Sequence, residues 1–190
     1  IELELVRGTA EIVQATLQTE RSVHQLDRAK AEQSKLYRAV EQLSEAKSEL
    51  QVIQAGVGSA GEFAAFHFAA VTLLRNGGEH EICAVSGPGA EELAGKTFRD
   101  NTGLVGMVVE TRHALPFRGG SETGKNVIFT RALSSPHMRS LLVLPLMVHQ
   151  DVLGTLVLGS REVGVFGSSV RPTLEVLARH IAVSLANARM

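Results

Sequence analysis

Residues 140–160 read SLLVLPLMVHQDVLGTLVLGS, two apolar runs separated by a short polar link. Each run has the length of a β-strand, so the stretch predicts two neighbouring strands over Ser140–Val148 and Val152–Ser160. The link between them is His149-Gln150-Asp151. Because the apolar residues are nearly continuous rather than alternating, we expect other parts of the chain to cover both faces of the resulting sheet.

A second pair of strands is predicted further towards the N-terminus. The first would run over Ala65–Arg75 and the second over Glu79–Ser86. Between them lies Asn76-Gly77-Gly78, a sequence typical of a tight turn, so the two runs are expected to form an antiparallel hairpin.

The region between the two strand pairs should hold a short helix and a long connection. Asn101 or Thr102 can cap a helix over Gly103–Thr111, although two glycines inside it make it weak. From Arg118 to His137 the chain is rich in Gly, Ser and Pro, which is typical of a long loop.

Both ends of the chain are predicted to be helical. From Thr9 to Ala55 there is neither Gly nor Pro, so we expect one long helix, ended by the glycines of residues 56–61. A closing helix should run from an N-cap at Ser168 or Ser169 to Met190. The predicted domains are therefore a helix over residues 1–54 and a compact domain over residues 55–190.

Apolar residues recur at alternating spacings of four and three along both helices. This repeat keeps one stripe facing a partner helix when two helices supercoil, so it predicts a coiled coil and a homodimer. The residues predicted to form the dimer seam are Leu36, Val40, Leu43, Leu50, Leu174, Leu177 and Ile181.

Length, composition and charge narrow the class of protein. The chain has 190 residues, of which 44% are hydrophobic and 21% are charged, with a formal net charge of −1. This balance is typical of a globular domain and disfavours binding to nucleic acid or to an anionic membrane. No apolar run reaches the length of a membrane span, and a single cysteine excludes an internal disulfide. We expect a cytoplasmic segment of a longer protein that continues into an output domain after Met190.

Several segments, taken in order, resemble the GAF family of regulatory domains. They are the strand Ala65–Leu74, Gly103–Gly106 with Glu110–Pro116, Arg139–Leu146, Val152–Leu158, Phe166 and the closing helix Leu174–Ala188. The resemblance implies an α+β fold, in which an antiparallel sheet of five or six strands has helices on both faces and is preceded by a long coiled-coil helix. It also implies a sensory or regulatory role without enzymatic activity, such as in two-component or cyclic-di-GMP signalling.

In that family, short helices and loops cover a ligand pocket on the sheet face opposite the terminal helices. The unidentified small molecule of this chain would then contact residues of the covering elements or of the strand beneath them. The predicted pocket residues are Phe98, Leu104, Val108, Phe117, Ile128, Phe129, Met138 and Ser140.

Other ligands known for the family find weaker support in the residues. Haem would need an axial ligand such as His67 or His137. Ser134-Ser135-Pro136-His137 resembles the chromophore region of phytochromes, but no cysteine lies nearby to bond a bilin. The spaced polar residues of cyclic-nucleotide-binding members are not recognisable, and the seven histidines form no spacing typical of a metal site. We therefore predict no cofactor and no metal, and keep haem and cyclic nucleotide as alternatives.

Two further alternatives come from other functional classes. Free methionine sulfoxide reductases share the fold but use several cysteines, whereas Cys83 stands alone in a predicted strand. A lone cysteine in a strand is more often a small buried apolar residue than a nucleophile. The second alternative is a structural dimerisation spacer, whose pocket would be filled by its own side chains.

Overall fold

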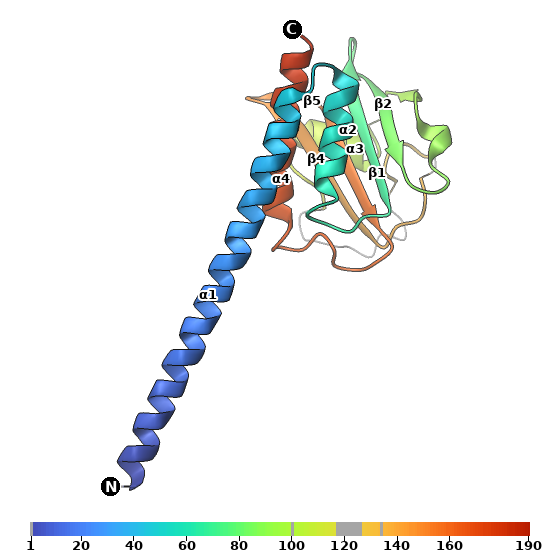
Figure 1. Cartoon of the computed structure of the whole chain (residues 1–190). Coiled ribbons are helices and arrows are strands. Elements are labelled where there is room, and N and C mark those ends of the chain that lie inside the picture. Colours follow the sequence, from blue (N-terminus) through green and yellow to red (C-terminus); the bar gives the residue numbers. More distant parts are fainter. Residues whose placement is uncertain (1, 100, 117–126, 134) are drawn as a thin grey trace. The chain divides into compact units, whose positions relative to one another are not determined.

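A computed structural model describes residues 2–99, 101–116, 127–133 and 135–190 of the chain (Figure 1). The chain divides into two compact units, Ile1–Arg38 and Ala39–Met190. The first unit contains most of helix α1, Glu2–Glu45. Its apolar residues Ile12 and Leu26 are 68% and 56% exposed, so their side chains are not buried within this unit.

The predicted single N-terminal helix is divided in the structure. Helix α1 ends at Glu45, and a second helix, α2, runs over Glu49–Ala60. The hydroxyl of Ser48 accepts a hydrogen bond from the backbone N–H of Gln51, and the Gln51 side chain accepts one from the N–H of Lys47. This pair resembles a capping box, except that the side chain of Gln51 accepts from Lys47, the residue before the N-cap. It starts a new helix where helix propensity alone predicted continuity.

Two of the glycines that were expected to end this helix instead lie within it, and Gly61 is the C-cap at its end. Helix α2 continues through Gly56 and Gly58 to Ala60. A Cβ atom on Gly56 would lie only 2.7 Å from Cδ1 of Ile181, in the closing helix. Gly56 is therefore needed for close helix packing rather than for helix termination.

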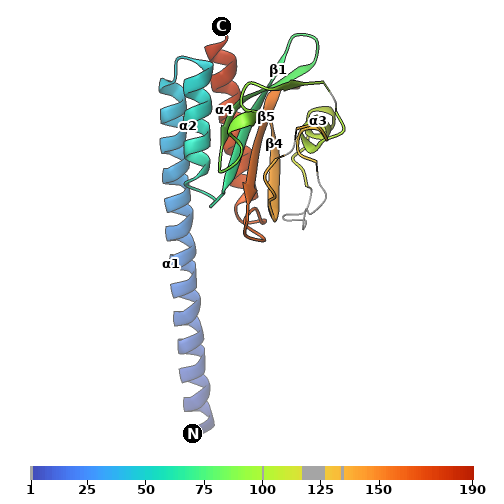
Figure 2. The ribbon, with the colours of Figure 1, turned by 90° about the vertical axis from the view of Figure 1, so that its right-hand side faces the viewer.

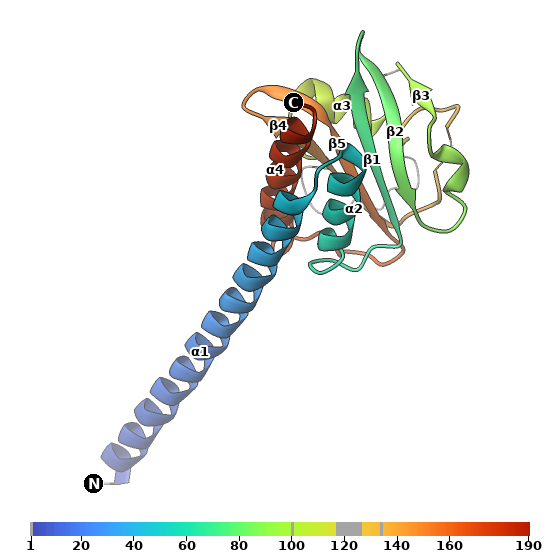
Figure 3. The ribbon, with the colours of Figure 1, turned by 45° about the horizontal axis from the view of Figure 1, so that its top comes forward.

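Five antiparallel strands form the sheet in the order β3-β2-β1-β5-β4. Their bounds are Phe68–Arg75 for β1, Glu79–Ser86 for β2, Thr97–Phe98 for β3, Ser140–Val148 for β4 and Asp151–Ser160 for β5. Figure 3 shows β3 at one edge of the sheet and β4 at the other. The predicted α+β fold with an antiparallel sheet is confirmed.

Two predicted boundaries shift for local reasons. Strand β1 begins at Phe68 rather than Ala65, because the chain first leaves α2 through a turn in which Ala64 N–H donates to the carbonyl of Ala60. The closing helix, α4, runs over Arg171–Ala188, and its N-cap is Val170 with no side-chain hydrogen bond. The predicted caps Ser168 and Ser169 therefore precede the helix.

Helices α2 and α4 cover one face of the sheet and helix α3, Leu104–Thr111, covers the other (Figure 2). A 3-10 turn, η1, at Glu91–Leu93 precedes β3. Each face has its own apolar cluster. The helix-face cluster contains Ala39, Leu43, Val52, Ile53, Ala60, Ala64, Ala69, Val71, Leu73, Ala114, Leu142, Leu144, Leu146, Leu156, Leu158, Phe166, Leu174, Leu177, Ala178, Ile181, Ala182 and Leu185. The roof cluster contains Phe68, Ala70, Ile82, Ala90, Leu93, Phe98, Leu104, Val105, Val108, Leu115, Ile128, Phe129, Met138, Leu141, Val143 and Val157.

Candidate functional site

The roof cluster is where the sequence predicted a ligand pocket, and most of the predicted residues meet there. They are Phe98, Leu104, Val108, Ile128, Phe129 and Met138. All six are at most 9% exposed, and Val108 and Phe129 are fully buried. These six side chains are thus buried together in the roof cluster, at the place where the pocket was predicted.

The other two predicted pocket residues are Phe117 and Ser140. Phe117 lies outside the described residues. The placement of Ser140 is corrected, because its neighbour Leu141 belongs to the roof cluster while Leu142 belongs to the helix-face cluster. Successive side chains of a strand point to opposite faces, so Ser140 shares the helix face with Leu142. Its hydroxyl is buried and has no hydrogen-bond partner among the described residues.

Backbone groups from a distant loop hold the beginning of α3. Its N-cap is Gly103, which offers no side-chain bond, and the N–H groups of Leu104 and Val105 donate to the carbonyls of Val127 and Ile128. A Cβ atom on Gly103 would lie 2.0 Å from the carbonyl oxygen of Phe129, so only glycine permits this approach. The predicted caps Asn101 and Thr102 do not cap the helix, because the loop carbonyls satisfy its first N–H groups.

One imidazole lies in this apolar surrounding, and sequence reasoning missed it. His80 is 1% exposed, stacks on Phe98 with ring centroids 4.7 Å apart, and places Nε2 3.0 Å from Oδ1 of Asn101. Because Oδ1 is an acceptor, Nε2 carries the proton in the neutral ring, and Nδ1 is left without a partner among the described residues. Burial lowers the pKa of His80, and the hydrogen bond to Asn101 opposes this only in part.

The histidines considered as haem ligands lie elsewhere. His67 is half-buried, and its Nδ1 accepts a hydrogen bond from the N–H of Arg161 while lying 3.2 Å from the hydroxyl of Ser160. His137 is exposed. Within the described ranges, no three His, Cys, Asp or Glu side chains are placed so as to hold a metal ion.

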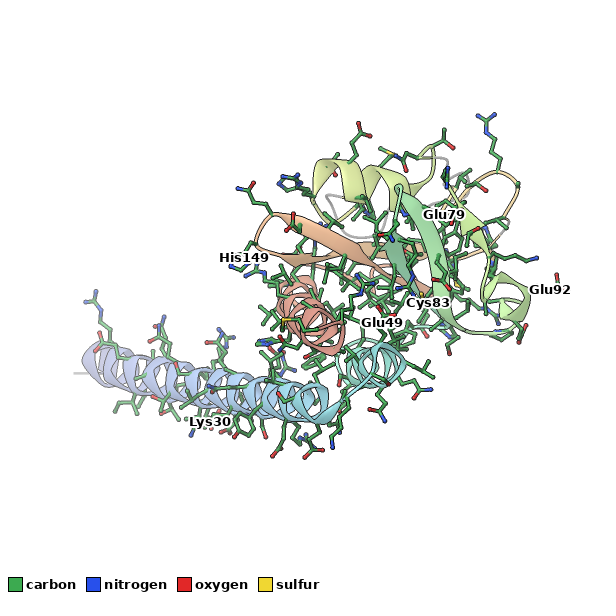
Figure 4. The ribbon with its side chains drawn as sticks, turned by 90° about the horizontal axis from the view of Figure 1, so that it is seen from above. Lys30, Glu49, Glu79, Cys83, Glu92 and His149 are labelled. Carbon is green, nitrogen blue, oxygen red and sulfur yellow. The ribbon has the colours of Figure 1, made fainter. Side chains whose placement is uncertain are left out.

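Cys83 has the properties of a structural thiol. Its side chain is half-buried against the helix-face cluster, on the face opposite the roof (Figure 4). Burial, with a further contribution from Glu81, raises the pKa of the thiol to about 11. Since the thiolate is the nucleophilic form, this environment suppresses the reactivity on which a cysteine-dependent reductase relies.

Helix α4 is attached to the chain at both of its ends. At its first turn, the guanidinium of Arg171 donates to the carbonyls of Ala114 and Pro116, which follow α3. We call this contact the roof anchor. Between those carbonyls, Leu115 exchanges two backbone hydrogen bonds with Val143 of the edge strand β4.

At the other end of α4, Arg189 forms an ion pair with Glu49 in the first turn of α2. Glu49 also accepts two hydrogen bonds of 3.1 Å from Arg75 of β1. Burial alone would raise the pKa of Glu49, but the hydrogen bonds from Arg75 and Arg189 outweigh it and lower the pKa. We call the Glu49–Arg189 pair the junction anchor, because it holds the end of α4 beside the α1–α2 junction (Figures 1 and 4).

The predicted dimer seam is corrected in part. Leu43, Leu174, Leu177 and Ile181 are at most 1% exposed and belong to the helix-face cluster, so the core of the same chain already uses them. Their spacing of four and three residues therefore places them on the side of each helix that faces the core of the same chain. Leu36 and Val40 are half-buried, and Leu50 is 56% exposed.

No helix in the described ranges is both long and apolar enough to cross a bilayer.

A family model described as GAF domain matches residues 3–185. No curated protein matches the chain.

Several solved structures resemble this chain at low sequence identity. The GAF domain of an Acinetobacter phosphoenolpyruvate-protein phosphotransferase has a TM-score of 0.69 at 19% identity, with coverage of 84% of this chain and 95% of that one. The GAF domain of a Bacillus halodurans two-component sensor histidine kinase gives 0.64 at 20%, over 76% and 97% of the chains. A free methionine-R-sulfoxide reductase from Neisseria meningitidis gives 0.67 at 16%, over 85% and 92%. At these identities the likeness concerns the fold alone.

Proposed function

Because this chain belongs to the GAF domain family, we propose that it is a non-enzymatic sensory or relay module of a larger signalling protein. GAF domains are commonly regulatory, and a phosphotransferase and a sensor kinase are among the proteins whose GAF domains share this fold. The raised pKa of Cys83 and its position away from the roof favour a regulatory role over that of a cysteine-dependent reductase.

The observation that carries the proposal is the attachment of α4 at both ends. The roof anchor joins its first turn to the segment after α3, and the junction anchor joins its last turn to α2. Helix α4 has 18 residues, which corresponds to roughly 27 Å. A displacement of the roof can therefore reach the α1–α2 junction through one rigid element.

Close packing supports a switch between discrete arrangements. Leu174, Leu177 and Ile181 of α4 share the helix-face cluster with Leu43 of α1 and Ile53 of α2. Packed cores resist continuous deformation, so a small change at the roof would favour one packing over another. The stimulus is a small molecule bound at the roof or a neighbouring domain, and the coupling it supplies would be roughly 1–3 kcal/mol.

We further propose that two copies pair through the exposed apolar stripe of α1, which includes Ile12 and Leu26 at the predicted coiled-coil spacing. Replacing both residues by Asp should convert a dimer into a monomer in light scattering at micromolar concentration. A matched Glu11→Asp and Gln25→Asp variant, altered at neighbouring exposed positions, should stay dimeric. A dimer that survives the Ile12 and Leu26 changes would contradict this pairing.

In the parent protein, the relay would act in the cytoplasm on an output domain after Met190, in two-component or cyclic-di-GMP signalling. A second candidate is a structural spacer, which is favoured by the complete burial of Phe129 and Val108 in the roof cluster. The two functions differ in whether the roof anchor matters for signalling.

The test is the output of the full-length parent protein after Arg171→Gln. For a relay, the difference between stimulated and unstimulated output should fall severalfold, because the roof loses its attachment to α4. Arg139→Gln, which alters an exposed arginine outside both anchors, is the matched control and should leave output unchanged. Unchanged output in a folded Arg171→Gln protein would contradict the relay and support the spacer.

A further inference from the structure

A groove of about 550 Å³ lies along the outer edge of the sheet, away from the roof cluster. Its walls are the residues after α3, the end of β4 with the β4–β5 turn, and the middle of α4. Figure 3 shows β4 at this edge beside α4, and Figure 4 labels His149 at the turn. The buried lining residues Ala114, Leu144 and Ala178 belong to the helix-face cluster, so this hollow is separate from the predicted pocket.

The rim of the groove is cationic. Arg112 and Arg179 both line it and are exposed, and neither has an ion-pair partner in the described part of the chain. His113 and His149 line it as well. The one acidic lining residue, Glu175, forms a salt bridge of 3.0 Å with Arg171, so its charge is already compensated.

The floor of the groove is apolar and includes Pro145, Met147 and Val148. An extended peptide would not fit this edge well, because Pro145 has no N–H to donate and Leu115 already uses the backbone groups of Val143. An apolar floor beneath a cationic rim instead suits a small molecule that has an apolar body and an anionic group.

Two backbone conformations give independent support. Arg112 has φ of 61° and His149 has φ of 56°, and they are the positive-φ residues other than glycine in the described ranges. Arg112 is the C-cap of α3, a position that glycine usually occupies. Left-handed backbone is unfavourable for a residue with a side chain, because the Cβ atom comes too close to the following carbonyl oxygen. At two strained positions the chain thus keeps a side chain that lines the same groove, which is typical of functional sites.

We propose that this groove binds a small organic anion, whose charged group contacts Arg112 and Arg179 and whose apolar body lies on Pro145 and Met147. Ala114 and Glu175 line the groove and are also hydrogen-bond partners of Arg171. A bound anion would therefore contact the same residues that form the roof anchor. Binding can be measured in the isolated chain, and its presence or absence does not depend on the proposed relay.

The test is a titration of the isotope-labelled chain with phenyl phosphate, followed by the chemical shifts of backbone amides. Benzyl alcohol is the uncharged probe of similar shape. Phenyl phosphate should cause saturable shifts within residues 112–114, 147–149 and 178–183, and benzyl alcohol should bind at least about tenfold more weakly. Loss of one charge-assisted contact corresponds to roughly tenfold in affinity, so Arg112→Gly and Arg179→Gln should each weaken binding by about that factor.

Arg112→Gly separates binding from folding, because glycine relieves the left-handed strain and the melting temperature should not fall. Arg139→Gln is the matched control and should bind phenyl phosphate as the unaltered chain does. The proposal is overturned if the two probes bind equally, if the Arg112→Gly and Arg179→Gln double variant keeps its affinity, or if the shifts map only to the roof cluster.

Discussion

On one face of the sheet, α2 and α4 are long helices whose side chains fill the helix-face cluster, whereas the roof on the other face is built from shorter elements. Helix α3 has eight residues, and η1 is a single turn. The beginning of α3 depends on the carbonyls of Val127 and Ile128, which belong to a loop. The roof also holds His80, whose Nδ1 lacks a partner in the described ranges. The helix face is thus stabilised by apolar packing between long helices and the sheet. The roof instead depends on loop carbonyls and contains the buried imidazole of His80.

The largest expected effect compares two leucines, one on each face. Leu177 is 0% exposed in α4, and Leu104 is 9% exposed at the beginning of α3. Replacing a buried leucine by alanine costs roughly 2–5 kcal/mol, and the cost falls when the surroundings can collapse. We expect Leu177→Ala to lie near the upper end of this range and Leu104→Ala near the lower end.

Urea unfolding measures the loss of stability in each variant. If the free energy of unfolding falls with urea concentration at the same rate in both variants, the same structure unfolds in both. Equal losses of stability would contradict the comparison, because the roof would then be packed as rigidly as the helix face.

A smaller effect should come from the ionisation of His80. Its pKa is lowered in the folded chain, mainly by burial, so the unfolded chain binds the proton more readily. The contribution of neutral His80 to stability is therefore fully present above about pH 6.5 and falls as the pH drops towards the folded-state pKa. The slope can be at most about 1.4 kcal/mol per pH unit.

The free energy of unfolding of His80→Phe, measured between pH 5 and pH 8, isolates this contribution. Phenylalanine can keep the stacking on Phe98 but cannot bind a proton, so the variant should lack the part of the pH dependence due to His80. His137→Phe, at an exposed position, is the control and should retain it. Identical pH profiles for the unaltered chain and His80→Phe would show that the roof does not sense protonation there.

Much of the helix face and its strands could be predicted from local patterns. The apolar runs at Ser140–Val148 and near Val152–Ser160 form strands. A continuous apolar run of this length is typical of a strand that is buried on both faces. Ser48 and Gln51 also carried a readable signal, since Ser followed three residues later by Gln marks a helix start. That signal was outweighed by the absence of Gly and Pro around it.

The rest depends on contacts that are distant in sequence. The carbonyls that hold α3 lie more than twenty residues after it begins, so no local pattern predicts them. Ser140 was assigned to the wrong face because its strand is apolar on both sides, and alternation is then invisible in the sequence. The same ambiguity affects Leu174 and Leu177, whose regular spacing fits a partner helix as well as the chain's own core.

The central claim is that α4 transmits a change at the roof anchor to the junction anchor, and hydrogen exchange of backbone amides tests it most directly. In Arg171→Gln, exchange should rise roughly fivefold both near the roof, at residues 112–116, and at the far end, in the first turn of α2 and the last turn of α4. Arg139→Gln should change neither region. A rise confined to residues 112–116 and the first turn of α4 would contradict the claim, because the two ends of the helix would then respond independently.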